Sequence, residues 1–162
     1  MSTVRWGIVG LGAIAHGVAG DFQFVPGAEL AAVASRTKEK AQEFAARHGV
    51  KHAYGSYREL LESPEVDVVY ISTPHPYHRD VALAAIANGK SVLVEKAFTA
   101  TLVGAQQVVD AARAKGVFAM EAMWTRFQPV VAAAREVVAW GRIGEVVAVQ
   151  GDLYAARDYE PG

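Results

Sequence analysis

Short apolar runs alternate regularly with longer segments of helical period, and this alternation is the strongest constraint on the fold. The runs are apolar throughout, which is typical of strands that helices cover on both faces. Strands separated by helices need crossover connections, which are right-handed and produce a parallel sheet. Strands are predicted at residues 4–10, 30–35, 52–54, 66–72, 91–94 and 117–120. Residues 1–123 are therefore predicted to form an α/β domain with a doubly wound parallel sheet.

Helices are predicted between these strands, at residues 13–24, 38–48, 77–88 and 101–115. Ser56 and Glu59 have the spacing of a capping box, which opens one more short helix. The regular pattern stops after residue 123. A helix is predicted over 124–140, and residues 145–155 alternate apolar with polar side chains, as a strand with one solvent face does.

A lone strand of this kind is not stable by itself. Residues 124–162 are therefore expected to be the connecting helix and first strand of an incomplete or missing α+β C-terminal domain. Its unpaired edge would invite another strand, so we expect a homo-oligomer.

Composition excludes several classes of function. The net charge is −1 and no long basic run occurs, which argues against nucleic acid or an anionic membrane surface as a partner. No apolar stretch approaches the roughly 20 residues of a membrane span. The first ten residues lack the order of a signal peptide. Because cysteine is absent, disulfides and thiolate metal sites are excluded, and we expect a cytoplasmic protein.

A G-x-G-x-x-A motif lies where the first predicted strand meets the first helix. Gly10 permits the tight turn, and Gly12 lets a pyrophosphate approach the backbone. Ala15 allows close helix–strand packing, while the helix start at Ala13 and Ile14 offers free N–H groups to phosphates. The motif follows a strand and opens a helix near the N-terminus, which is the context that a dinucleotide-binding (Rossmann) domain requires.

The end of the second strand indicates which dinucleotide binds. An NAD site places an acid there for the ribose 2′-hydroxyl, whereas a 2′-phosphate needs a cation. This sequence has Ser35, Arg36 and Thr37, with no acid before Glu39. Ser35 or Thr37 could instead cap the next helix and leave Arg36 in solvent. The missing acid favours NADP(H), with NAD(H) possible.

Ligands of doubly wound sheets bind beyond the carboxyl ends of the strands, where the strand order reverses. Five residues fall at such ends and are expected to share one rim: Gly10, Ser35, Thr73, Glu95 and Glu121.

The loop after the fourth strand, Ser72 to His78, contains two prolines that stiffen it. Thr73, Pro74 and His75 are expected to form a wall beside a flat ring. His75 and His78 have the spacing of a metal pair, but no third ligand is evident, so no metal site is predicted. His78 is expected in the first helical turn, bonded to backbone groups of the loop, or else on the surface.

The fifth strand ends on Glu95 and Lys96. These could be a solvated charge pair that marks the end of the strand. Their position beside the switch point favours another interpretation, in which Lys96 donates a proton or hydrogen bond to a substrate oxygen during hydride transfer and Glu95 orients it.

Four segments together resemble the Gfo/Idh/MocA oxidoreductases, over residues 4 to about 130: GLGAIA, STPHPYH, VLVEKAF and EAMWTRF. The last segment and SRT are most similar to the branch of dimeric dihydrodiol and NADP-dependent xylose dehydrogenases. The resemblance implies NAD(P)-linked oxidation of a hydroxyl of a sugar, polyol or trans-dihydrodiol, with Lys96 as the catalytic lysine. It also implies that Trp124 and Arg126 lie close to the cofactor and substrate.

The sequence departs from this family in two ways. The usual Glu-Lys-Pro is Glu-Lys-Ala here, so Ala97 is expected to constrain the lysine turn less than proline would. Family members are also longer and carry a C-terminal domain with a second catalytic acid or base. The sequence is therefore compatible with two functions: an NADP(H)-dependent dehydrogenase, and a nucleotide-binding module without catalysis of its own.

Overall fold

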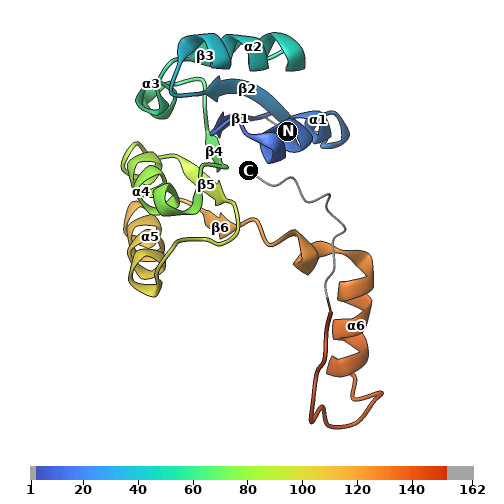
Figure 1. Cartoon of the computed structure of the whole chain (residues 1–162). Helices are drawn as coiled ribbons and strands as arrows, with labels where there is room; N and C mark the ends of the chain where they lie inside the picture. Colours follow the sequence, from blue (N-terminus) through green and yellow to red (C-terminus); the bar gives the residue numbers. More distant parts are fainter. Residues whose placement is uncertain (1–2, 153–162) are drawn as a thin grey trace, which may run out of the picture. The chain divides into compact units, whose positions relative to one another are not determined.

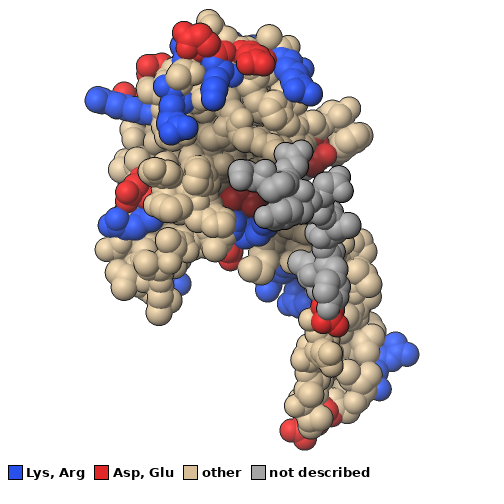
Figure 2. Space-filling view, in the orientation of Figure 1, with Lys and Arg blue, Asp and Glu red and all other residues tan. Residues whose placement is uncertain are grey.

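The computed structural model describes residues 3–152. The chain divides into two compact units, Met1–Met123 and Trp124–Gly162, which are described separately below. Within the described residues, every helix is too short or too polar to cross a membrane. On the face of the molecule that Figure 2 shows, acidic and basic side chains are interspersed, as the near-zero net charge predicts.

The first unit is built on one six-stranded parallel sheet, as predicted (Figure 1). The strands run in the order β3-β2-β1-β4-β5-β6, so the order reverses at β1, which pairs with both β2 and β4. The strands are β1 (Val4–Val9), β2 (Ala28–Ala34), β3 (His52–Tyr54), β4 (Val68–Ile71), β5 (Ser91–Val94) and β6 (Ala119–Glu121). The observed bounds differ from the predicted ones by at most two residues, the usual uncertainty of strand ends.

Helices cover both faces of this sheet, which explains why its strands are continuously apolar. Ala15 of α1 and Phe44 of α2 pack on one face with Ile8, whereas Leu60 of α3 and Val108 of α5 pack on the other. The helices are α1 (Ala13–Asp21), α2 (Lys38–His48), α3 (Tyr57–Glu62), α4 (His78–Ala87) and α5 (Leu102–Lys115), with the 3₁₀ helices η1 (Phe22–Phe24) and η2 (His75–Tyr77).

The predicted cap of α3 is confirmed on one side, since the Oγ of Ser56 accepts a hydrogen bond from the Glu59 N–H at 3.3 Å.

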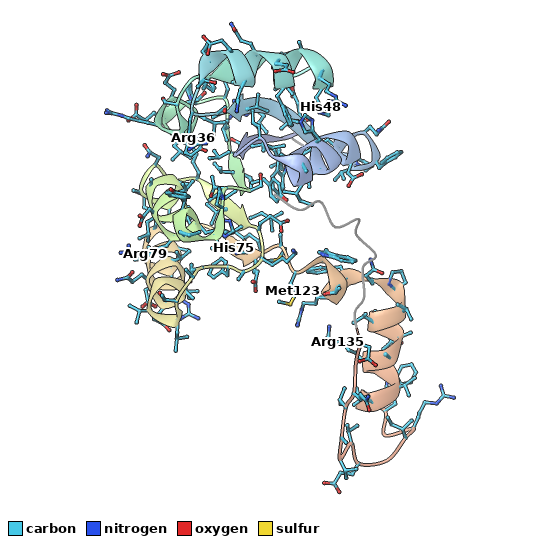
Figure 3. The ribbon with its side chains drawn as sticks, viewed as in Figure 1. Arg36, His48, His75, Arg79, Met123 and Arg135 are labelled. Carbon is cyan, nitrogen blue, oxygen red and sulfur yellow. The ribbon has the colours of Figure 1, made fainter. Side chains whose placement is uncertain are left out.

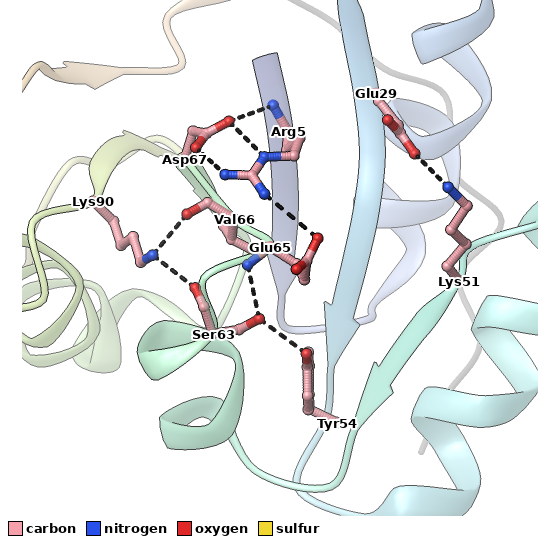
Figure 4. A network of polar contacts seen from close by, with 9 residues as sticks. All are labelled: Arg5, Glu29, Lys51, Tyr54, Ser63, Glu65, Val66, Asp67 and Lys90. Carbon is pink, nitrogen blue, oxygen red and sulfur yellow. Dashed lines mark hydrogen bonds and ion pairs between the residues drawn. The ribbon is translucent and has the colours of Figure 1, made fainter. Parts of the chain in front are cut away.

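A polar network fixes the amino ends of β1 and β4 (Figure 4). These strand ends lie opposite the carboxyl ends that form the predicted rim. The Arg5 guanidinium bonds both carboxylate oxygens of Asp67, at 2.7 and 3.1 Å, and this bond lowers the pKa of Asp67. The Lys90 ammonium donates to the carbonyls of Ser63 and Val66, each at 2.7 Å. These contacts hold the loop that leads into β4.

The second unit begins with η3 (Trp124–Phe127) and continues with α6 (Pro129–Ala139). The prediction of one helix over 124–140 is therefore wrong at Gln128, whose backbone is extended (φ −68°, ψ 133°). The residue before a proline is driven out of the helical region by the proline ring, so Pro129 separates the two helices.

The strand predicted at 145–155 is not observed over residues 145–152, and residues 153–155 lie outside the described residues. The alternating pattern supplies a half-apolar face, but a strand also needs a neighbouring strand for its backbone hydrogen bonds. Residues 145–152 have no such partner within the described part of the chain. The edge on which the expected self-association rested is thus not observed there.

Two histidines join α1 to α2. The Nδ1 of His16 lies 2.8 Å from the Nε2 of His48, and both rings pack against the ring of Phe44, with centroids 4.5 Å apart. Figure 3 labels His48 at the end of α2. Burial, followed by the charges of His16 and Arg47, lowers the pKa of His48.

This pair predicts a loss of stability on mild acidification. Because the pKa of His48 is lowered by folding, the unfolded chain binds more protons once the pH falls to its ordinary value of 6.5 and below. The free energy of unfolding should therefore fall between about pH 7.5 and about pH 5.5, and His48→Gln should make that fall smaller. Urea unfolding at both pH values measures this, and equal pH dependence in both proteins would contradict it.

Candidate nucleotide-binding and catalytic site

A cavity of about 670 Å³ opens at the carboxyl ends of β1, β2 and β4, at the predicted switch point. The register places the last residues of these strands and of β5 and β6 in one row, since Val9 pairs with Ala34 and Ile71, and Val94 pairs with Ile71 and Glu121. The lining residues come from five segments: Gly10, Leu11, Gly12, Ser35, Arg36, Lys40, Tyr57, Ser72, Thr73, Pro74 and Tyr77.

The turn after β1 lies in direct contact with the chain after β4. Gly10 has a φ of +89°, and a Cβ at this position would lie 2.7 Å from the Thr73 nitrogen, so only glycine fits. The Ser72 hydroxyl donates to the Gly10 carbonyl at 2.7 Å. The Thr73 hydroxyl is buried beside the cavity and has no hydrogen-bond partner in the described part of the chain.

The start of α1 is open to the cavity. Gly12 is the N-cap residue, no side chain caps the helix, and no acid lies in its first turn. Among residues 3–152, a Cβ built on Gly12 would meet no atom within 4 Å, and the φ of −86° suits any residue. Nothing in this described part of the chain therefore requires glycine here, whereas a phosphate approaching the free N–H groups would. Ala15 is fully buried and packs against Ile8, so its predicted packing role is confirmed.

The β2 end of the cavity is basic. Arg36 and Lys40 both line it and are exposed, and no carboxylate pairs with either among residues 3–152. Ser35 is buried at the same end. Ser35 and Thr37 are the two candidates for capping α2, and Thr37 occupies the N-cap position without a capping hydrogen bond from its side chain. No acid of the described residues lines the cavity, and such a lining suits a phosphate.

His78 begins α4 and is fully buried. Its Nε2 lies 2.6 Å from the Thr73 carbonyl oxygen and its Nδ1 lies 2.9 Å from the Ala97 carbonyl oxygen. The predicted contact of His78 with backbone groups is thus confirmed; both ring nitrogens face carbonyl oxygens, and a neutral imidazole donates its single N–H to one of them. His75 lies in η2, with its ring 5.4 Å from that of His78 in an edge-to-face arrangement.

The fifth strand delivers Glu95 and Lys96 to the same rim. One carboxylate oxygen of Glu95 accepts from the buried Tyr70 hydroxyl at 2.7 Å, and the other accepts from the Lys96 backbone N–H at 3.2 Å. Burial, with the bond to Glu95, raises the pKa of Tyr70, so its hydroxyl stays neutral and donates. Glu95 therefore holds the backbone of Lys96. The Lys96 side chain is exposed, and the peptide bond after it is cis.

The sequence reasoning missed several lining residues. Lys40 lies in the first turn of α2, and its closeness in sequence to Arg36 was the signal that could have found it. Ser72 and Tyr77 belong to the loop segment already singled out. Leu11 lies within the glycine motif, but no local signal marks Tyr57, which reaches the cavity from α3.

Three features of the cavity fit a dinucleotide phosphate group. They are the open space beside Gly12, the Thr73 hydroxyl without a partner among the described residues, and the basic end without a described acid in its lining. Comparison with known proteins agrees with this. Residues 4–123 match the model of the oxidoreductase family with an NAD-binding Rossmann fold, GFO_IDH_MocA. The chain belongs to the Gfo/Idh/MocA oxidoreductase family. The expected family and fold are thereby confirmed.

The family relatives include trans-1,2-dihydrobenzene-1,2-diol dehydrogenase from Bos taurus, 41% identical over 152 residues, which are 93% of this chain and 45% of the relative. An NAD binding oxidoreductase from Klebsiella pneumoniae is 34% identical, with a TM-score of 0.84, over 89% of this chain and 40% of its own. A 3-ketoreductase from Actinomadura kijaniata, solved with TDP-benzene and NADP, is 30% identical, with a TM-score of 0.82, over 89% and 46%. The chain thus spans less than half of each relative's length.

Two residues that the family resemblance placed near the active site belong to the second unit. Trp124 and Arg126 lie in η3 and are exposed. Ala13 and Ile14 begin α1 and are exposed beside the cavity lining. The roles of these residues in cofactor binding stay predictions.

Alanine at the two glycines should have opposite effects. Gly10→Ala meets the Thr73 backbone and a positive φ, which alone costs about 2 kcal/mol of unfolding free energy. Gly12→Ala should leave stability unchanged but weaken NADPH and NADH binding about tenfold, equivalent to about 1.4 kcal/mol, because its methyl group enters the open space. Thermal unfolding and fluorescence titration measure the two effects. Unchanged affinity in Gly12→Ala would contradict this reading of the cavity.

Proposed function

We propose that this chain carries the NADP(H)-binding domain of a dehydrogenase that acts on a hydroxyl of a sugar, polyol or trans-dihydrodiol. The observation that carries the proposal is the cavity at the switch point. It has open space beside Gly12, and its basic end is lined by Arg36 and Lys40 with no acid among the described lining residues. The names of two relatives, a dihydrodiol dehydrogenase and a 3-ketoreductase, support the substrate class. Oxidation of a hydroxyl and reduction of a ketone are the two directions of one hydride transfer, and each moves one proton at the oxygen.

A nicotinamide, when bound, would supply the hydride chemistry, and the residues of this chain would position the substrate and transfer the proton. Lys96 lies at the end of β5, on the rim that also carries the glycine turn. In the reducing direction its ammonium gives a proton to the substrate oxygen, and in the oxidising direction the neutral amine accepts the hydroxyl proton. His78 and the Glu95 carboxylate hold the backbone on either side of the lysine.

Selectivity for NADP(H) should come from Arg36 and Lys40. A hydrogen bond to a charged group contributes about 1.5–3 kcal/mol, so Arg36→Ala and Lys40→Ala should each weaken NADPH binding about tenfold or more. NADH lacks the 2′-phosphate, so its affinity should change little. Lys51→Ala is a matched control, because Lys51 pairs with Glu29 on the surface and lies outside the cavity lining. Titrating both cofactors tests this, and a tenfold preference of the unchanged chain for NADH would overturn it.

The lysine is tested by turnover. Lys96→Met should lower kcat about 100-fold or more with NADP⁺ and trans-1,2-dihydrobenzene-1,2-diol or xylose, because it removes the proton donor and acceptor. The affinity for NADPH should stay within about threefold, a change below 1 kcal/mol. Lys51→Met provides the control for loss of a lysine. Equal turnover of Lys96→Met and the unchanged chain would exclude the proposed role.

A second function is a nucleotide-binding module without catalysis of its own. The cavity supports this alternative too, because its glycine turn and its basic end serve binding of the dinucleotide rather than chemistry on a substrate. Tight NADPH binding without turnover across a panel of sugars, polyols and diols would support the module. Turnover that Lys96→Met abolishes would support the dehydrogenase.

A further inference from the structure

Three side chains contact the turn that carries Lys96: His78 of α4, Glu121 of β6, and Glu95, which precedes the lysine in the turn itself. Each bond reaches a backbone group of one of three consecutive residues. The bonds are Glu95 Oε2 to the Lys96 N–H (3.2 Å), His78 Nδ1 to the Ala97 carbonyl (2.9 Å) and Glu121 Oε1 to the Phe98 N–H (2.8 Å). The sequence predicts that Ala97 constrains this turn less than a proline would. In the structure, side-chain contacts reach the backbone of all three residues of the turn.

Glu121 is the member of this set to which the proposed reaction gives no role. It is the last residue of β6, opposite Val94 in the parallel ladder, and the Ala122 N–H bonds the Val94 carbonyl at 2.7 Å. This register brings its carboxylate beside the chain that leaves β5. The bond to Phe98 is charge-assisted, and such bonds are about twice as strong as neutral ones. The Phe98 ring packs on the core cluster of the sheet, so this residue is held on two sides.

We propose that Glu121 is a positioning residue that fixes the Lys96 turn through the Phe98 N–H; this rests on the proposed function of Lys96. With the Phe98 N–H held by β6 and the Lys96 N–H held by Glu95, the segment between them has both ends fixed. Without Glu121 the Phe98 end is released, and the lysine ammonium has a wider range of positions. Misplacement of a catalytic group by about 1 Å can lower a rate about 100-fold.

Two variants of Glu121 separate positioning from proton transfer. Glu121→Met removes the acceptor while keeping a side chain of similar length, whereas Glu121→Gln keeps an acceptor oxygen but removes a carboxylate that could take a proton. Glu62→Met is the matched control, because Glu62 pairs only with Arg58 on the surface of α3. Amide hydrogen exchange at Phe98 reports the bond, and acetylation of Lys96 with and without saturating NADPH reports its position by peptide mass spectrometry.

In the unchanged chain, NADPH should protect Lys96 from acetylation. Glu121→Met should speed exchange at Phe98 about tenfold or more, as loss of one charge-assisted hydrogen bond predicts. It should also reduce the NADPH protection of Lys96 at least threefold, with the affinity for NADPH within about threefold. kcat should fall about tenfold to 100-fold with little change in KM. Glu121→Gln keeps the acceptor, so it should stay close to the unchanged chain in each of these measurements.

The outcomes distinguish the two proposals. If the unchanged chain binds no NADPH, or NADPH does not protect its Lys96, the proposed function fails and the positioning role fails with it. If the unchanged chain is protected but Glu121→Met is protected equally, only the positioning role is overturned. If Glu121→Gln loses turnover as fully as Glu121→Met while its Phe98 exchange stays slow, Glu121 acts in proton transfer and the positioning role is again overturned.

Discussion

The contact between the turn after β1 and the chain after β4 is the constraint on which the rest of the site depends. Gly10 lies so close to the Thr73 backbone that a single methyl group cannot fit between them. The Ser72 hydroxyl closes the same contact through the Gly10 carbonyl. Because β1 and β4 are neighbours while β2 lies on the other side of β1, the chain diverges here in both directions. The cavity occupies that divergence.

Basic and acidic side chains lie at different ends of the rim. At the β2 end, Arg36 and Lys40 line the cavity and no acid among the described residues does, so an anion would meet uncompensated positive charge. Glu95 and Glu121 lie at the β5 and β6 end, and their carboxylate oxygens accept hydrogen bonds from other groups of the protein. Their effect there is to fix backbone, and Lys96 keeps an exposed side chain.

The fold could be predicted almost entirely from local patterns. Continuous apolar runs indicated strands covered on both faces, and the glycine motif at the end of the first run located the switch point. The predictions were wrong where the apolar pattern was followed without regard to a proline or to the need for a neighbouring strand. Pro129 breaks the helix predicted over 124–140, and residues 145–152 alternate as a strand does but have no partner strand among the described residues. Thr37, one of the two candidates for capping α2, stands at the N-cap without making the capping bond.

The sequence by itself determined the sheet, the glycine turn and the delivery of Lys96 to a strand end, because each depends on residues adjacent in the chain. Only the tertiary structure decided which distant side chains meet there. Tyr57 reaches the cavity from α3, and Glu121 reaches Phe98 from the neighbouring strand. Such meetings depend on the register between strands and on the packing of crossover helices. Hydrophobic periodicity specifies that an element forms, but it does not specify which side chain will lie opposite it.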